Sequence, residues 1–200
     1  MKNLGTSDRL VRVIIAEACV IAAFFWAKGD LQLLLVLAAA VMMIPVIKGS
    51  CGLYEILGWN SCEIVKRKDK NIKTAFVVAA LLLAVVGSFA SAVLTKNIFL
   101  EDLGQVDEAY TLALASTGQG ETGNATAQQE RLERAFAAFQ DKYSQYRPLT
   151  VKYDANFTAQ MNNLSEAIAG SKEDMLQGNL TSAHEELKKM GPIIEKMQDR

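Results

Sequence analysis

The feature that most constrains this chain is an uncharged, apolar run of 22 residues, 74–95. As an α-helix this run is about 33 Å long, which is enough to cross the hydrocarbon core of a bilayer. Two shorter apolar runs precede it at residues 13–27 and 31–47. Each is marginal alone, but a tight turn at Lys28-Gly29-Asp30 joins them, and we predict a helical hairpin in the membrane. The sequence therefore predicts three transmembrane helices.

Charge divides the chain at Lys96. Residues 1–96 contain 11 Lys and Arg against 6 Asp and Glu, a net charge of +5, whereas residues 97–200 contain 10 against 16, a net charge of −6. The formal net charge of −1 is thus the sum of opposite charges on two parts of the chain. It excludes a basic nucleic-acid binder. We expect three segments: a membrane hairpin with a cytoplasmic segment (1–73), a third transmembrane helix (74–96) and an extracytoplasmic helical domain (97–200).

Lys and Arg in the short loops predict the orientation. The N-terminus carries three and the segment 48–73 carries six, against two on the opposite side, Lys28 and Lys96. The positive-inside rule therefore makes the N-terminus and the segment 48–73 cytoplasmic, and the third helix exports the remainder. The basic residues that close this segment are also suited to contact lipid headgroups; they are Lys66, Arg67, Lys68, Lys70 and Lys73.

Three charged residues, Arg9, Arg12 and Glu17, lie near the start of the first apolar run. Two interpretations stay open for them. Their long side chains can reach out to the membrane interface, or they can form an ion pair or a functional carboxylate within the membrane.

Two sequence motifs flank the predicted hairpin. The chain opens on N-x-G-x-x-D-R-x-x-R, and after the hairpin it continues C-G-L-Y and then L-G-x-N-x-C. The motif residues are Asn3, Gly5, Asp8, Arg9, Arg12, Cys51, Tyr54, Gly58, Asn60 and Cys62. On these motifs, about residues 1–63 resemble the YgaP-like inner-membrane transmembrane domain family.

The resemblance implies a bacterial inner-membrane location and a two-helix membrane domain that self-associates, so we expect a homo-oligomer. It implies no activity for that domain. One departure is Gly52, which stands where the family usually has proline and would loosen the turn there.

Cys51 and Cys62 share the predicted cytoplasmic side, and three interpretations stay open for them. They can be packed thiols, a redox pair or persulfide acceptor, or two ligands of an incomplete metal site.

Residues 97–200 show helical periodicity throughout. The pattern predicts helices at about 99–116, 125–146 and 150–177, and a fourth from about Thr181 with a kink at Gly191-Pro192. Short connections between amphipathic helices predict an antiparallel four-helix bundle. The buried face of the third helix is expected to consist of Tyr153, Phe157, Met161, Leu164 and Ile168.

His184 is the only histidine and borders the buried face of the fourth helix, so it is a candidate haem or metal ligand. Residues 178–187 loosely resemble the last helix of periplasmic b-type cytochrome bundles, in which such a His pairs with a Met on the first helix. Residues 97–160 contain no Met, so we predict no cofactor and a structural or surface histidine.

No familiar catalytic motif is present, and we expect no enzyme. The leading hypothesis is a membrane protein whose exported bundle binds an extracytoplasmic partner or a small ligand. The alternatives are a redox or haem carrier, using His184 outside or the Cys51 and Cys62 thiols inside, and a sensor that signals through a partner.

Overall fold

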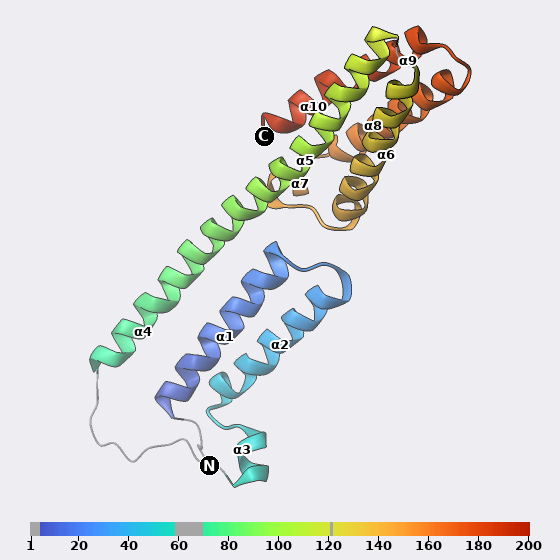
Figure 1. Ribbon diagram of the computed structural model, residues 1–200. Coiled ribbons are helices and arrows are strands. Elements are labelled where there is room, and N and C mark those ends of the chain that lie inside the picture. Colours follow the sequence, from blue (N-terminus) through green and yellow to red (C-terminus); the bar gives the residue numbers. More distant parts are fainter. Residues whose placement is uncertain (1–4, 59–69, 121) are drawn as a thin grey trace. The chain divides into compact units, whose positions relative to one another are not determined.

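The computed structural model describes residues 5–58, 70–120 and 122–200 (Figure 1). Within these ranges the chain is helical and contains no β-strand, in agreement with the predicted fold class. The chain divides between Val93 and Leu94 into two compact units.

The first unit is built on a hairpin of α1 (Thr6–Phe25) and α2 (Gly29–Lys48), which pack against each other. Gly29 begins α2 with a φ of +54°, in the left-handed region that glycine adopts without strain. Small residues let the two backbones approach closely, as in membrane helix pairs; those buried in the two helices are Ala16, Ala23 and Ala39. The predicted hairpin is therefore present.

Two of the described helical stretches are long and apolar enough to cross a membrane, Gly29–Lys48 and Thr74–Gln119. The helix α1 has the length of a span, but it carries four charged residues in its first twelve positions. Length and composition alone thus support two spans.

After the hairpin, α3 (Gly52–Leu57) is a short helix that ends at Gly58, whose φ is +67°. Its residue Ile56 is largely exposed, as expected for a segment lying at a membrane interface. Residues 59–69 of the predicted cytoplasmic segment lie outside the described residues.

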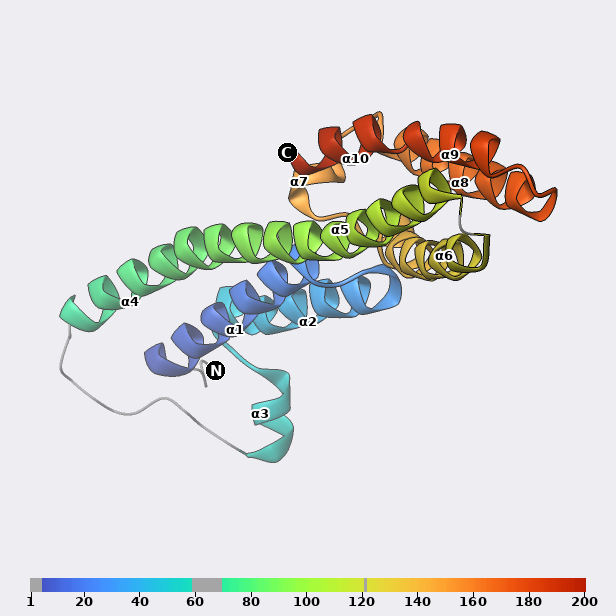
Figure 2. The same ribbon diagram turned by 45° about the horizontal axis from the view of Figure 1, so that its top comes forward.

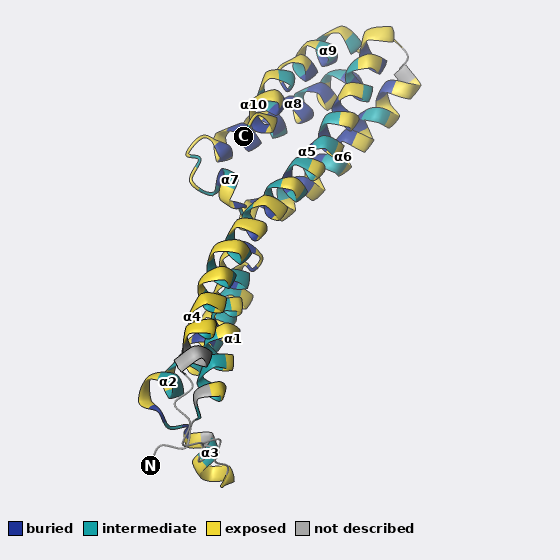
Figure 3. Ribbon diagram, turned by 90° about the vertical axis from the view of Figure 1, so that its left-hand side faces the viewer, coloured by how far each residue is buried: buried dark blue, intermediate teal, exposed yellow. Residues whose placement is uncertain are grey.

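A continuous helical stretch follows, made of α4 (Lys70–Leu82), the π-helical turn η1 (Leu83–Gly87) and α5 (Ser88–Gln119) (Figure 2). A Cβ atom on Gly87 would lie 3.1 Å from the Cδ1 atom of Ile21, so the glycine lets α1 pack closely there. Apolar side chains are exposed along the first part of this stretch, whereas one face of α5 is buried from Phe99 onward (Figure 3).

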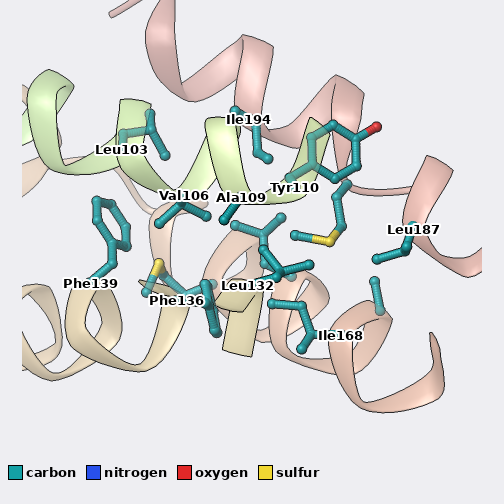
Figure 4. Packing of buried hydrophobic residues seen from close by; sticks show 14 of the residues in the cluster. Leu103, Val106, Ala109, Tyr110, Leu132, Phe136, Phe139, Ile168, Leu187 and Ile194 are labelled. Atoms are coloured by element: carbon teal, nitrogen blue, oxygen red, sulfur yellow. The ribbon is translucent and has the colours of Figure 1, made fainter. Parts of the chain in front are cut away.

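The second unit packs its helices around one hydrophobic core (Figure 4). At one end of this core the rings of Phe99, Phe139, Tyr143 and Phe157 are in mutual contact, with Phe99 touching the other three. Besides α5, the helices of this unit are α6 (Thr122–Gln145), α7 (Leu149–Lys152), α8 (Phe157–Leu176), α9 (Leu180–Lys188) and α10 (Gly191–Gln198).

The single helix expected over 150–177 is wrong, because the structure breaks it between α7 and α8. At the break, the Asp154 carboxylate accepts a hydrogen bond of 2.9 Å from the backbone N–H of Asn156 and forms an ion pair with Arg200. The break moves Tyr153 off the buried face, and this side chain is 77% exposed. The other residues expected on that face, which all lie in α8, are buried.

The expected kink at Gly191-Pro192 is present as the boundary between α9 and α10. A Cβ atom on Gly191 would lie 3.0 Å from the hydroxyl oxygen of Tyr110, and a hydrogen bond joins that hydroxyl to the Gly191 backbone. The bend therefore depends on contact with α5 as well as on proline.

The burial of the core predicts a sharp difference between two leucines. Leu187→Ala, at a fully buried position, should lower the free energy of unfolding of the second unit by about 2–5 kcal/mol. Leu176→Ala, at a position that is 80% exposed, should change it by less than about 0.5 kcal/mol. Denaturant titration of the full chain in detergent, followed by circular dichroism, measures both. Equal effects would contradict the core described here.

Candidate functional site

The motif residues at the two ends of the hairpin meet at Arg12. The Arg12 Nε atom donates a hydrogen bond of 2.9 Å to the Asp8 carboxylate one turn earlier, and the two side chains are only 15% and 16% exposed. Arg12 Nη1 lies 3.9 Å from the sulfur of Met42 on α2. Its guanidinium carbon lies 5.3 Å from the centre of the Tyr54 ring, and a side-chain hydrogen bond joins Arg12 to Tyr54. One cation thus links α1, α2 and α3.

Cys51 belongs to the same cluster. It is only 6% exposed, it lies at the N-cap of α3, and its thiol is close enough to Arg12 to interact with it electrostatically. The structure thus brings together Asp8, Arg12, Cys51 and Tyr54, which we call the motif cluster.

Two motif glycines serve helix ends. Gly5 is the N-cap of α1, and Gly58 caps α3 in the left-handed conformation. Gly52 is the first residue of α3, with nothing within 4 Å of where a Cβ would lie. That position accepts proline without loss of a helical hydrogen bond. The departure from the family pattern is therefore compatible with the same local fold.

The other motif residues, Asn3, Asn60 and Cys62, lie outside the described residues, so the interpretations of the Cys51 and Cys62 pair stay open. Lys66, Arg67 and Lys68 also lie outside them, whereas Lys70 and Lys73 belong to the first turn of α4. The expected contact of this basic group with lipid headgroups stays a prediction.

The other two charged residues of α1 have a different environment from Arg12. The Nε atom of Arg9 and the Oε2 atom of Glu17 are covered and have no hydrogen-bond partner among the described residues. Arg12 forms an ion pair with Asp8, whereas both interpretations given for these three residues stay predictions.

In the second unit, His184 joins α9 to the end of α5. Its Nδ1 atom lies 3.0 Å from Thr117 Oγ1 and 3.1 Å from the carbonyl oxygen of Leu114. Since a carbonyl oxygen only accepts, Nδ1 carries the proton in the contact with Leu114. The Cε1 atom would lie 3.3 Å from a Cβ on Gly118. The helix expected to end at about residue 116 instead continues to Gln119, and its last turn packs against this imidazole.

A metal site needs several ligands in one place. Among the described residues, no group of three or more His, Cys, Asp or Glu side chains could hold a metal ion. The contacts of His184 are those of a residue that holds two helices together.

Asp102, which the sequence pattern did not single out, accepts hydrogen bonds of 2.5 Å from both Lys142 and Tyr143. Burial and the hydrogen bond to Asp102 raise the pKa of the Tyr143 phenol, so this group stays a proton donor. The spacing of Lys142 and Tyr143 in the sequence could not predict this site, because their partner Asp102 lies on another helix.

Residues 1–64 match the family described as "Inner membrane protein YgaP-like, transmembrane domain". The match covers the hairpin, α3 and the whole motif cluster, and the resemblance found in the sequence is thus confirmed. No curated protein and no solved structure matches the chain.

The motif cluster predicts that Arg12 shields Cys51. Because a charge-assisted hydrogen bond contributes about 1.5–3 kcal/mol, Arg12→Gln should release α3 and speed maleimide labelling of Cys51 by about tenfold. The labelling rate is measured in a Cys19→Ser, Cys62→Ser background. Arg9→Gln removes the same charge and should leave the rate unchanged. Equal labelling rates in the Arg12→Gln and Arg9→Gln variants would show that Arg12 does not shield Cys51.

His184→Ala should lower the free energy of unfolding of the second unit by about 1–3 kcal/mol, because the part-buried carbonyl oxygen of Leu114 loses its contact with the imidazole. In combination with Thr117→Val, the loss should be less than additive, since the two side chains contact each other. Denaturant titration measures the cycle, and Lys188→Ala on the exposed side of α9 is the control. An additive result would contradict the described contact.

Proposed function

We propose, from the premise that residues 1–64 form a YgaP-like membrane domain, that this chain is a three-span inner-membrane protein that displays a helical bundle outside the cytoplasm. The bundle binds a protein partner or a small ligand and performs no catalysis. The membrane domain holds the bundle at the membrane and self-associates.

The observation that carries this proposal is the change of character along the helical stretch Lys70–Gln119. Most of its large apolar side chains between Val77 and Leu94 are exposed, as they are in a helix surrounded by lipid. From Phe99 onward, apolar side chains are buried on one face against the other helices of the second unit. A single helix thus leads from a lipid-like environment into a water-soluble domain, and the change occurs near Lys96.

The third span in the proposal is α1. A charged residue in a membrane helix is costly, but an ion pair within the helix lowers that cost. Asp8 and Arg12 form such a pair near the start of α1. From Val13 to Phe25 the only charged residue is Glu17. The length of 20 residues and the packing on α2 support a helix that crosses the membrane.

The bundle in the proposal consists of α5, α6 and α8, with α9 and α10 together as a bent fourth helix. The apolar stripes of these helices are buried in one core. His184 is held by Thr117 and Leu114. Recognition by this domain therefore rests on its outer surface, which is mainly polar and belongs to the half of the chain with a net charge of −6.

Reporter fusions test the proposed topology. A fusion at Asp69 should report the cytoplasm and a fusion at Gly123 the opposite side, because one span separates them. Alkaline phosphatase and a fluorescent protein active only in the cytoplasm are the two reporters. Fusions that report the same side would refute the three-span topology.

The visible spectrum of the purified protein separates this proposal from the haem alternative. We expect no Soret band in protein purified from membranes of cells grown with a haem precursor. A Soret band that disappears in His184→Ala would instead establish a haem carrier, and proteins that co-purify with the chain would identify the partner.

A further inference from the structure

Residues 146–156 connect α6 to α8. Both ends of this connection contact the part of α5 that begins the second unit. A side-chain hydrogen bond joins Tyr146 to Thr95. At the other end of the connection, the ring centre of Phe157 lies 6.2 Å from that of Phe99. Both ends of the connection are thus held within about one helical turn of Lys96.

A third contact passes through Arg200. The Lys96 ammonium donates a hydrogen bond of 2.6 Å to the backbone oxygen of Arg200. The Arg200 guanidinium forms an ion pair with Asp154 and donates a hydrogen bond of 2.7 Å to Gln160. Asp154 follows Tyr153 directly, so this chain of contacts ties the exposed tyrosine to the same part of α5.

Thr95 is the last residue of the uncharged run 74–95, and Lys96 is the first charge after it. If the run crosses the bilayer, its end marks the level at which hydrocarbon gives way to headgroups. The connection lies at that level because Tyr146 and Arg200 bond to these two residues. Figure 1 shows α7 and the C-terminus together at this end of the second unit.

The exposed side chains of the connection suit that level. Tyr153 is 77% exposed and Leu149 is 39% exposed, while Val151 between them is buried in the core. Tyrosine is enriched at membrane interfaces, where its ring contacts acyl chains and its hydroxyl contacts water and headgroups. Lys96, Arg147 and Lys152 lie in or beside this connection, and their charge is complementary to lipid phosphates.

We propose that the connection between α6 and α8 is a second membrane contact, in which Tyr153 and Leu149 insert into the headgroup region of the bilayer's extracytoplasmic leaflet. The occupant of this surface is lipid, because the connection is continuous in space with the end of a membrane-spanning helix. The proposal rests on the proposed topology, in which the run 74–95 crosses the bilayer. Its consequence is that the second unit is held at the membrane by two points and not by one helix.

Tryptophan fluorescence in liposomes tests this proposal with matched positions. In a Trp26→Phe, Trp59→Phe background, single tryptophans are introduced by Tyr153→Trp and by Leu176→Trp. Leu176 is 80% exposed, which is similar to Tyr153. Tyr153 precedes the start of α8, whereas Leu176 is the last residue of α8, so the two positions lie at opposite ends of this helix. A third variant, Phe89→Trp, marks the centre of the proposed span, where the side chain is 70% exposed. Circular dichroism checks that each variant keeps its helix content.

The quencher is phosphatidylcholine brominated near the headgroup end of its acyl chains. We expect quenching and a blue-shifted emission for the Tyr153→Trp variant and no quenching for the Leu176→Trp variant. Lipid brominated deep in the chain should quench the Phe89→Trp variant more strongly than the Tyr153→Trp variant.

Four results would overturn the proposal, and they have different meanings. No quenching at position 153 with strong quenching at position 89 would refute the membrane contact and leave the span intact. Equal quenching at positions 153 and 176 would mean that the whole second unit lies on the lipid. No quenching at position 89 would refute the span itself, and the proposed function with it. A blue shift at position 153 that depends on protein concentration in the absence of bromine would identify a second copy of the chain as the occupant.

Discussion

The structure depends on one constraint, which is that a single helical stretch, Lys70–Gln119, exposes apolar side chains in its first part and is amphipathic in its last part. Most of the large apolar side chains from Val77 to Leu94 are exposed, which is unfavourable in water over such a length. Its last part keeps one apolar face, which is stable only where other helices cover it. The remaining helices of the second unit supply that cover, and their aromatic side chains gather on Phe99, the first buried large residue after Lys96.

In the first unit, the contacts between the helices centre on one residue. Three helices converge at Arg12, which contacts Asp8 in its own helix, Met42 in the next and Tyr54 in the third. Since the arginine is paired and stacked, its charge is compensated where little water reaches it. The family match and this cluster cover the same part of the chain, so the cluster gives a physical reason for the motif.

Periodicity was sufficient to predict the helices that are amphipathic or continuously apolar. The hairpin, the stripe of Leu132, Phe136, Phe139 and Tyr143, and the bend at Gly191 could all be predicted from local sequence. The break at Asp154 could not be, because one of the contacts made there comes from Arg200, at a distant position in the chain. The contact of His184 with Thr117 could not be predicted either, because α5 continues beyond its expected end at about residue 116.

The contact between Tyr110 and Gly191 links two positions that are far apart in the chain. The tyrosine hydroxyl occupies the space that any side chain at 191 would need. A side chain at 191 requires this hydroxyl to move by a few tenths of an ångström, and loss of the hydroxyl at 110, for example as phenylalanine, relieves the contact. These two positions should therefore accept substitutions jointly, and among relatives that keep the bend between α9 and α10 they should change as a pair.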